Sequence, residues 1–308
     1  MIKKDIFDKD VKAQFKASAK DRIHRFMMAD KTIKGAIIHS TRMIREMQAN
    51  HNLGPLETLV LGQAYIAAGL LCSTLKENSE RVSIQIQCSG PIKGLDVESN
   101  FFGEVRGYLK TNEIQVENPD RIKYLSTLYG AGFLTVTRYV ESASRPYSGQ
   151  VALEYGSVAE DLANYFLVSE QIPTGFKLSL FFDDTQTLQG AGGIFLQALP
   201  GADPQKVVRA EQMIQAIDSL GQMFANGMEP EQVIKESFPD LDPVFSTSRR
   251  VEFFCRCSKE KMEKYIKTLP KAERKELMTN GPFPLEVCCH HCNSFYYFDQ
   301  DDLRGLDK

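Results

Sequence analysis

The sequence predicts an α+β fold with a mixed N-terminal core, a helical linker and a small C-terminal unit. Strand and helix patterns are mixed over residues 1–202 without a regular β-α-β rhythm, whereas residues 203–248 are mainly helical in pattern. Five of the seven cysteines fall between positions 255 and 292. We therefore expect three parts: a core domain over 1–202, a linker over 203–248 and a cysteine-rich domain over 249–308.

The composition is that of an ordinary soluble protein. Of 308 residues, 43% are hydrophobic and 25% are charged, and 37 basic against 40 acidic residues give a net charge of −3. This balance provides no general attraction to nucleic acid or to an anionic membrane. The start lacks a continuous apolar signal segment, and the apolar stretch over 56–75 contains polar residues, as in a buried helix. We expect a cytoplasmic protein.

Alternating apolar residues predict strands in the first half of the core. Residues 21–39 suggest two strands around Asp30 and Lys31, and residues 81–109 continue as strands separated by glycine turns. Helices are expected over residues 40–50 and 55–76, where apolar residues recur at helical spacing.

The second half of the core combines strands with one clear helix start. Strand patterns flank a turn-rich segment at 145–149, and another strand is expected over 176–182. Ser157 and Glu160 have the spacing of a capping box, so a helix should begin there. The Gly-Ala-Gly-Gly run at 190–193 lacks a phosphate-binding pattern, and we interpret it as a tight turn.

The linker pattern begins with Asp203 as a helix cap and Pro204 as the first helical residue. We predict one helix over 204–226, a shorter helix over 230–237, and a tether over 240–248. The apolar face of the first helix consists of Met213, Ile217, Leu220 and Phe224.

The clustered cysteines predict a zinc site. In an extended strand residues two apart face the same side, and a C-x-x-C pair has the usual spacing of a zinc knuckle. Four thiolates satisfy the tetrahedral preference of Zn²⁺, so we expect one ion per chain. The predicted ligands are Cys255, Cys257, Cys289 and Cys292. Cys288, His290 or His291 could replace Cys289.

The same cysteines could form a redox switch. A disulfide between residues two apart departs from relaxed geometry and is easily reduced, and nearby positive charge favours the reactive thiolate. The charged residues close in sequence are Arg249, Arg250, Arg256 and Lys259.

Loss of zinc should unfold the C-terminal domain. Structural zinc contributes about 10–16 kcal/mol of apparent binding free energy, and a segment of about 60 residues has little core of its own. If the 204–226 helix packs against this domain, its apolar face would become exposed and could bind unfolded clients. A static structural zinc site and an ordinary buried helix face are the alternatives.

Several motifs together resemble the redox-regulated 33-kilodalton heat-shock chaperonin family over nearly the full chain. They include the C-x-C-S at 255–258, the C-x-x-C followed by an aromatic end at Phe298, LGQAYIAAGLL within 53–76, GPIKGLDVES, VRGYL, RPYSGQVAL, GSVAEDLANYF and SEQIPTG. Cys288 is an additional thiol that the family pattern does not need.

The resemblance implies a holdase chaperone of the stress response that works without ATP and is inactive when reduced and zinc-bound. It implies that oxidation pairs Cys255 with Cys257 and Cys289 with Cys292 as zinc leaves. The linker would then unfold, and the oxidised protein would dimerise and hold unfolding clients.

Two other functions compete with this interpretation. A thiol-disulfide oxidoreductase would use the C-x-x-C at a helix start, and a zinc ribbon could bind nucleic acid, although the chain end is acidic. Cys72 and Cys88 are interpreted as small buried hydrophobic residues. No conventional catalytic motif is found, so we expect neither an enzyme nor a nucleotide user.

Overall fold

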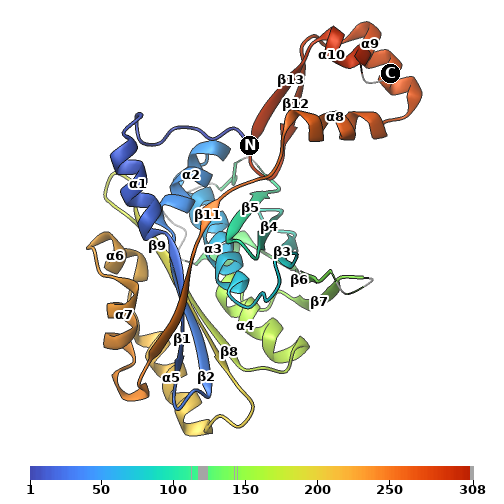
Figure 1. The fold of residues 1–308 in the computed structure, drawn as a ribbon. Helices are drawn as coiled ribbons and strands as arrows, with labels where there is room; N and C mark the ends of the chain where they lie inside the picture. The colour runs from blue at the N-terminus through green and yellow to red at the C-terminus, as the bar shows by residue number, and fades with distance from the viewer. Residues whose placement is uncertain (112, 117–123, 142, 144, 306–308) are drawn as a thin grey trace.

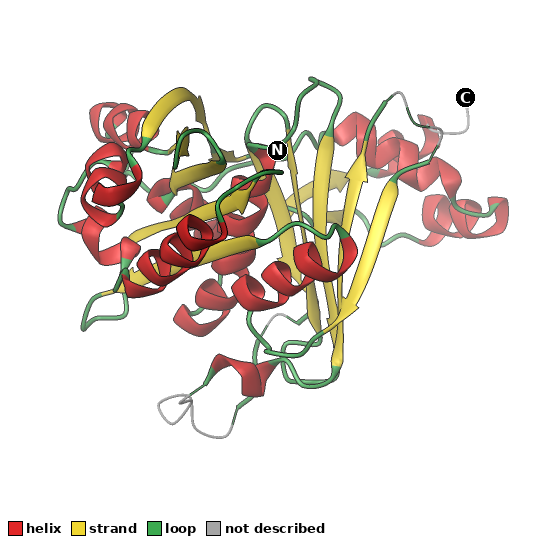
Figure 2. Cartoon of the chain, turned by 90° about the horizontal axis from the view of Figure 1, so that it is seen from below, coloured by secondary structure: helices red, strands yellow, loops and turns green. Residues whose placement is uncertain are grey.

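Two large β-sheets and two groups of helices form alternating layers in the computed structural model (Figure 1), and a two-stranded sheet lies near the end of the chain. The structure describes residues 1–111, 113–116, 124–141, 143 and 145–305. Figure 2 shows the strands lying between groups of helices when the chain is viewed from below. The predicted α+β class is confirmed.

The first sheet is antiparallel and has the strand order β10-β1-β2-β9-β8. Its strands are β1 (Arg22–Met28), β2 (Ile33–His39), β8 (Thr174–Phe182), β9 (Leu188–Ala198) and β10 (Val244–Arg250). The two predicted strands around Asp30 and Lys31 are confirmed as β1 and β2. Both of these turn residues have positive φ, which lets the chain reverse tightly.

The second sheet has six strands in the order β11-β5-β4-β3-β6-β7. They are β3 (Arg81–Cys88), β4 (Gly94–Asn100), β5 (Glu104–Leu109), β6 (Gly132–Tyr139), β7 (Tyr147–Ala152) and β11 (Glu252–Phe253). The short β11 runs parallel to β5, whereas the other neighbours are antiparallel. Strand β7 begins at Tyr147, inside the segment predicted to be a turn.

Helix α3 (Pro55–Cys72) lies between the sheets and contacts β2, β8 and β9 on one side and β3, β4 and β5 on the other. It is long and apolar enough to cross a membrane, but 78% of it is buried inside the structure. Its composition is therefore explained by burial on all sides. Helices α2 (Thr41–His51) and α4 (Val158–Ser169) complete this layer, and α1 (Val11–Lys20) precedes the first sheet.

The linker contains three helices, α5 (Pro204–Ala216), α6 (Leu220–Ala225) and α7 (Pro230–Ser237), followed by the 3-10 turn η3 (Pro239–Leu241). The prediction of one helix over 204–226 was wrong. Ile217 adopts an extended backbone conformation, and Ser219 caps a new helix by accepting a hydrogen bond from the backbone amide of Gln222 at 3.2 Å. The break therefore has a local cause in the sequence.

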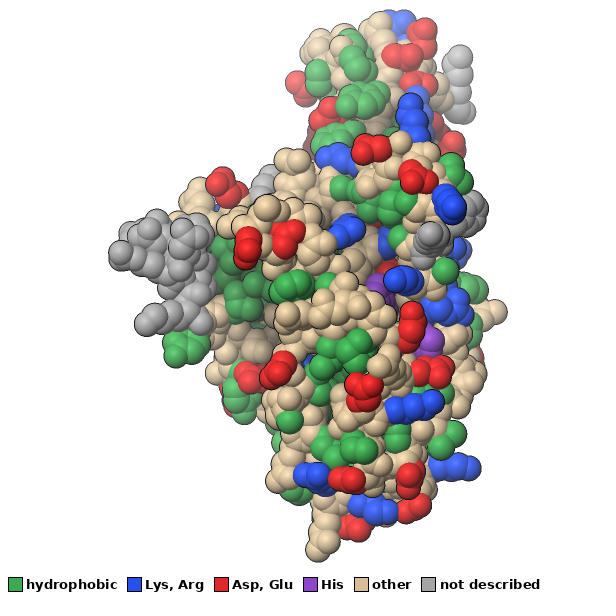
Figure 3. Space-filling model, turned by 90° about the vertical axis from the view of Figure 1, so that its left-hand side faces the viewer, with side chains coloured by type: hydrophobic (Ala, Val, Ile, Leu, Met, Phe, Trp, Pro, Cys, Tyr) green, Lys and Arg blue, Asp and Glu red, His purple; other side chains and the backbone are tan. Residues whose placement is uncertain are grey.

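The linker helices pack on the five-stranded sheet rather than on the cysteine-rich domain, so the apolar face has the buried position of the alternative interpretation. The predicted apolar face is buried together with sheet residues that include Phe26, Ile33, Ile37 and Ile194. Its residues are Met213, Ile217, Leu220 and Phe224, none more than 9% exposed. Acidic and basic side chains are interspersed on the outer side of this region (Figure 3).

The glycine-rich run at 190–193 lies inside β9, so its interpretation as a tight turn was wrong. A Cβ atom at Gly190 would lie 1.9 Å from the Gly221 carbonyl oxygen of α6, and one at Gly192 would lie 2.2 Å from the Phe224 ring. These glycines allow α6 to approach the sheet closely.

We expect Gly190→Ala to loosen α6 and to lower the free energy of unfolding by about 1–3 kcal/mol, because overpacking displaces the helix. Chemical denaturation measures the change, and limited proteolysis of the linker locates it. Gly175→Ala on β8 is the matched control, since its Cβ would meet no atom closer than 4.0 Å. Equal stability of the two variants would contradict this account.

The segment predicted as a tether forms part of the first sheet instead. Strand β10 pairs with β1 and runs across the predicted boundary between residues 248 and 249. The division into three parts remains a prediction. The chain end contains α8 (Lys259–Thr268), α9 (Lys271–Asn280), β12 (Leu285–Cys289), β13 (Ser294–Phe298) and α10 (Gln300–Gly305).

Candidate metal centre

Two separate parts of the chain bring the four predicted cysteines together. Cys255 and Cys257 follow β11 in an extended segment, and both are buried. Cys289 ends β12 and Cys292 lies in the turn before β13, where the Cys289 carbonyl accepts hydrogen bonds from the amides of Cys292 and Asn293. The C-x-x-C pair thus occupies a β-hairpin knuckle, as the sequence suggested.

The four sulfur atoms all lie within 4.8 Å of one another. Cys255 Sγ is 3.8 Å from Cys289 Sγ, and Cys257 Sγ is 3.3 Å from Cys292 Sγ. Four sulfurs at about 2.3 Å from a tetrahedral zinc ion would be roughly 3.8 Å apart. The size of the cluster and its all-thiol donor set therefore fit Zn²⁺.

The alternative ligands lie elsewhere. Cys288 points to the opposite face of β12 and donates to the side-chain oxygen of Asn293 at 3.3 Å, because neighbouring residues in a strand alternate in direction. The rings of His290 and His291 lie against Tyr108, with centroids 5.9 and 5.5 Å away. Among the described residues, the cluster that could hold an ion contains Cys289 and neither histidine.

Polar groups contact three of the sulfurs. The Tyr296 hydroxyl lies 3.1 Å from Cys257 Sγ, Ser294 Oγ lies 3.2 Å from Cys292 Sγ, and an Arg106 guanidinium nitrogen donates to Cys255 Sγ at 3.3 Å. The hydrogen bond with Cys257 opposes ionisation of Cys255, but those with the other two thiols and Arg106 lower the pKa of Cys255 to about 6. Arg106 thus favours the thiolate form.

The basic residues expected to surround the C-x-C pair are paired with other groups. Arg250 lies 3.1 Å from Glu252, Arg256 lies 2.7 Å from Glu104, and Lys259 lies 2.7 Å from Asp302. Arg249 donates to the Phe101 carbonyl. The cation at the sulfurs is instead Arg106, which is held by Glu98 at 2.6 Å. Arg106 could not be recognised from the sequence as a neighbour of the sulfurs, because it lies 149 positions before Cys255.

Hydrogen bonds fix the centre against the core. Gly107 on β5 donates to the His291 carbonyl at 3.1 Å, and Phe254 donates to the Val105 carbonyl at 3.0 Å. The buried Asn50 side chain donates to the carbonyls of Ile2 and Cys292, each at 2.9 Å. The cysteine knuckle is therefore docked on both β5 and α2.

Three comparisons with known proteins agree on one family. The family model described as Hsp33 protein matches residues 21–299. The chain belongs to the Hsp33 family. It is 34% identical to the 33 kDa chaperonin of Agathobacter rectalis, covering 93% of this chain and 99% of the relative. It is 33% identical to that of Acetivibrio thermocellus, covering 94% and 97%.

A solved structure of the family has the same fold. The crystal structure of the 33 kDa chaperonin from Thermotoga maritima superposes with a TM-score of 0.84 at 30% identity, covering 93% of this chain and 97% of that one. The resemblance inferred from the sequence motifs is therefore confirmed for this Hsp33 chain.

The remaining cysteines lie apart from the centre. Cys72 is fully buried at the end of α3, and burial raises the pKa of its thiol to about 11. Cys88 is half-buried at the end of β3, and burial raises its pKa as well. Both thiols are thereby kept protonated near neutral pH.

We expect serine substitution of Cys255, Cys257, Cys289 or Cys292 to lower bound zinc well below one ion per chain, because each removes one thiolate. Elemental analysis of reduced protein measures the metal content. Cys288→Ser is the control and should retain a full ion. Loss of zinc from that variant alone would show that Cys288 replaces Cys289.

We expect Asn50→Ala to loosen the cysteine knuckle, because the buried Cys292 carbonyl loses its side-chain donor at a cost of about 1–3 kcal/mol. Hydrogen exchange of the amides around residues 289–294 should accelerate in the reduced protein. Gln48→Ala on the same helix is the control. Unchanged exchange in the Asn50 variant would mean that α2 does not hold the knuckle.

Proposed function

We propose that this Hsp33-family protein is a redox-regulated, ATP-independent holdase that is inactive when reduced and active when oxidised. The single observation that supports this proposal is that two members of the four-cysteine cluster, Cys255 and Cys257, lie just after β11, which itself follows β10, the strand that leads from the linker. A conformational change at the cysteines can thus be transmitted to the linker through β11 and β10.

In the reduced state, Cys255, Cys257, Cys289 and Cys292 would hold one zinc ion as thiolates. A zinc ion bound there supplies cross-linking free energy to a small domain, about 10–16 kcal/mol in apparent terms. The four cysteines thereby keep the segment after β11 joined to the β12-β13 hairpin. Hydrogen bonds from β5 and α2 hold the same hairpin against the core.

Oxidation would convert the four thiolates into two disulfides, each formed by loss of two electrons. Peroxide accepts each pair of electrons and, with two protons, becomes water. The family resemblance pairs Cys255 with Cys257 and Cys289 with Cys292. These disulfides remove all four thiolate ligands, so the ion is released and the small domain loses its main source of stability.

Unfolding of the cysteine-rich unit would loosen the linker helices by releasing strands β11 and β10, and not by breaking a direct contact with a linker helix. β11 is the edge strand of the six-stranded sheet and has two residues, and β10 is the edge strand of the other sheet. Strand β10 places Phe245 against Phe26, with ring centroids 5.6 Å apart. Release of β11 and β10 would therefore weaken the layer that buries Met213, Ile217, Leu220 and Phe224.

Exposed in this way, the four apolar residues would bind unfolding clients, and two oxidised chains would associate. We propose that the protein acts in the cytoplasm without a catalytic step. The oxidoreductase alternative is disfavoured because the C-x-x-C pair lies in a hairpin turn rather than at a helix start. Nucleic-acid binding finds no support in the ion-paired basic residues near the centre.

The proposal is tested by aggregation of a thermally unfolding client in the presence of reduced, zinc-loaded protein or of peroxide-treated protein. Zinc release is followed in the same samples. We expect only the oxidised, zinc-free protein to suppress aggregation, and reductant with zinc to reverse the effect. Equal suppression by both forms with the metal retained would contradict the switch.

A further inference from the structure

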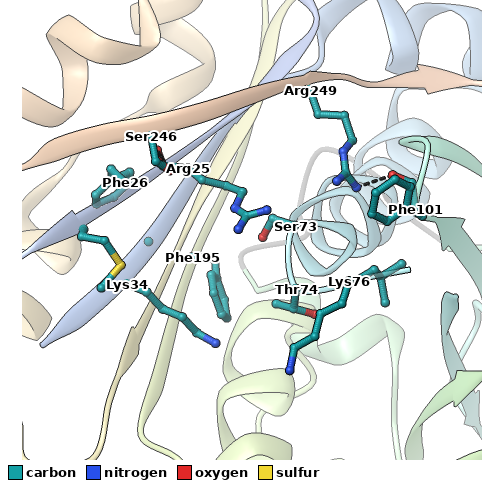
Figure 4. A pocket seen from close by; sticks show the side chains of 13 residues that line it. Arg25, Phe26, Lys34, Ser73, Thr74, Lys76, Phe101, Phe195, Ser246 and Arg249 are labelled. Carbon is teal, nitrogen blue, oxygen red and sulfur yellow. Dashed lines mark hydrogen bonds between the residues drawn. The ribbon is translucent and has the colours of Figure 1, made fainter. Parts of the chain in front are cut away.

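A cavity of about 500 Å³ lies between strands of the five-stranded sheet, including β10, and the loop that follows α3 (Figure 4). Its walls come from strands β1, β2, β9 and β10, from the loop after α3 at residues 73–76, and from Phe101. The cavity is separate from the cysteine cluster, and none of the functions discussed above uses it.

Four basic side chains line this cavity, and no aspartate or glutamate is among its described lining residues. They are Arg25, Lys34, Lys76 and Arg249. In Figure 4, Arg25 extends from β1 towards Ser73, and Arg249 turns towards Phe101. Arg249 donates to the Phe101 carbonyl and lies 3.9 Å from the centre of its ring. Within the described part of the chain, no carboxylate forms an ion pair with Arg25, Lys34 or Lys76.

The positive charges around the cavity are close enough to affect one another. Burial lowers the pKa of Lys34, and repulsion from Arg138, Lys76 and Arg25 lowers it further, against a smaller attraction from Glu170. Like charges held together in a partly buried space destabilise the fold unless a counter-charge is present. A bound anion would relieve this repulsion.

We propose that this cavity binds a small phosphate-bearing anion. Guanidinium and ammonium groups are the usual protein partners of phosphate oxygens, and the volume is within the range of about 300–1,000 Å³ typical of small-molecule sites. The hydroxyls of Ser73 and Thr74 already donate to the Leu70 and Leu71 carbonyls. The four basic side chains would therefore make the main contacts with the phosphate oxygens.

Two sources could supply this phosphate chemistry, a nucleotide or an inorganic phosphate chain. Phe101 and Phe195 line the same cavity and could contact a base, whereas an inorganic chain would use the cations alone. The two sources are separated by comparing ATP with tripolyphosphate.

Because the cavity lies beside β10, a bound anion would affect release of the linker on oxidation. This part of the inference rests on the proposed redox switch. Arg249 belongs to β10, whereas Lys34 belongs to β2 and Lys76 to the loop after α3. An anion contacting all three would fasten β10 to the core. Because a ligand stabilises the state that binds it, the anion would oppose release of the linker on oxidation.

Binding is measured by isothermal titration calorimetry of the reduced, zinc-loaded protein at low ionic strength with tripolyphosphate, ATP or adenosine. We expect tripolyphosphate and ATP to bind and adenosine not to bind. Equal affinities would indicate an inorganic phosphate site, and at least tenfold tighter binding of ATP would indicate a nucleotide site. The proposal is wrong if neither anion binds or if adenosine binds as tightly as ATP.

The variant K34Q/K76Q should weaken binding roughly a hundredfold, about tenfold for each lost charged contact. It is expected to fold, because neither ammonium group forms an ion pair with a carboxylate of the residues that the structure describes. K235Q/K264Q removes the same charge from exposed positions on α7 and α8 and should bind as the unmodified protein does. Equal loss in both variants, or no loss in the first, would contradict the site.

The regulatory effect has its own measurement, the rate of zinc release by peroxide with and without tripolyphosphate. We expect slower release with the anion in the unmodified protein and no slowing in K34Q/K76Q. Release unaffected by bound anion would contradict the effect on β10. If peroxide releases no zinc at all, the redox switch is wrong, and the calorimetric result for the cavity is unaffected.

Discussion

The convergence of four cysteine sulfurs within 4.8 Å is the interaction on which the C-terminal part of this structure depends. These sulfurs come from two parts of the chain, the segment after β11 and the β12-β13 hairpin. In the sequence, 31 residues separate Cys257 from Cys289. The cluster joins them in a region where helix α9 has no buried residue. Without a bound metal, only a small group of buried apolar side chains would hold this unit together, among them Met262, Ile266, Tyr296, Phe298 and Leu303.

Strands β10 and β11 join the cysteine cluster to the linker helices, whose apolar face is buried on the five-stranded sheet. The path is short: Cys255 follows β11, β11 follows β10, and β10 follows the linker helices. Each of these two strands forms the edge of a different sheet. An edge strand has one neighbour, so it is held by half the backbone hydrogen bonds of a central strand. The fold therefore places two edge strands between the cysteines and the linker.

The sequence predicted the elements whose signals are local. Strands around Asp30 and Lys31, the helix starting after Ser157 and the hairpin knuckle at Cys289 all follow from alternation, capping or motif spacing. The same holds for the four clustered cysteines, because ligand spacing is a property of the sequence itself. Their role as ligands and their oxidised pairing remain proposals.

What could not be predicted depends on contacts between distant residues. Residues 244–250 become a strand because β1 offers an unpaired edge, and the glycines at 190–193 form part of a strand because α6 packs closely on them. Arg106 reaches Cys255 only because β5 pairs with β11. The linker face packs on the sheet for a similar reason: the apolar surface that receives it is assembled from β1, β2 and β9.

The most direct test of this account is hydrogen exchange of the whole chain in the reduced, zinc-loaded state and after peroxide treatment. We expect backbone amides of β10, β11 and the linker helices to lose protection together with zinc, whereas those of α3 and β9 keep it. Full protection of residues 204–253 after zinc release would contradict the claim that the cysteines control the linker.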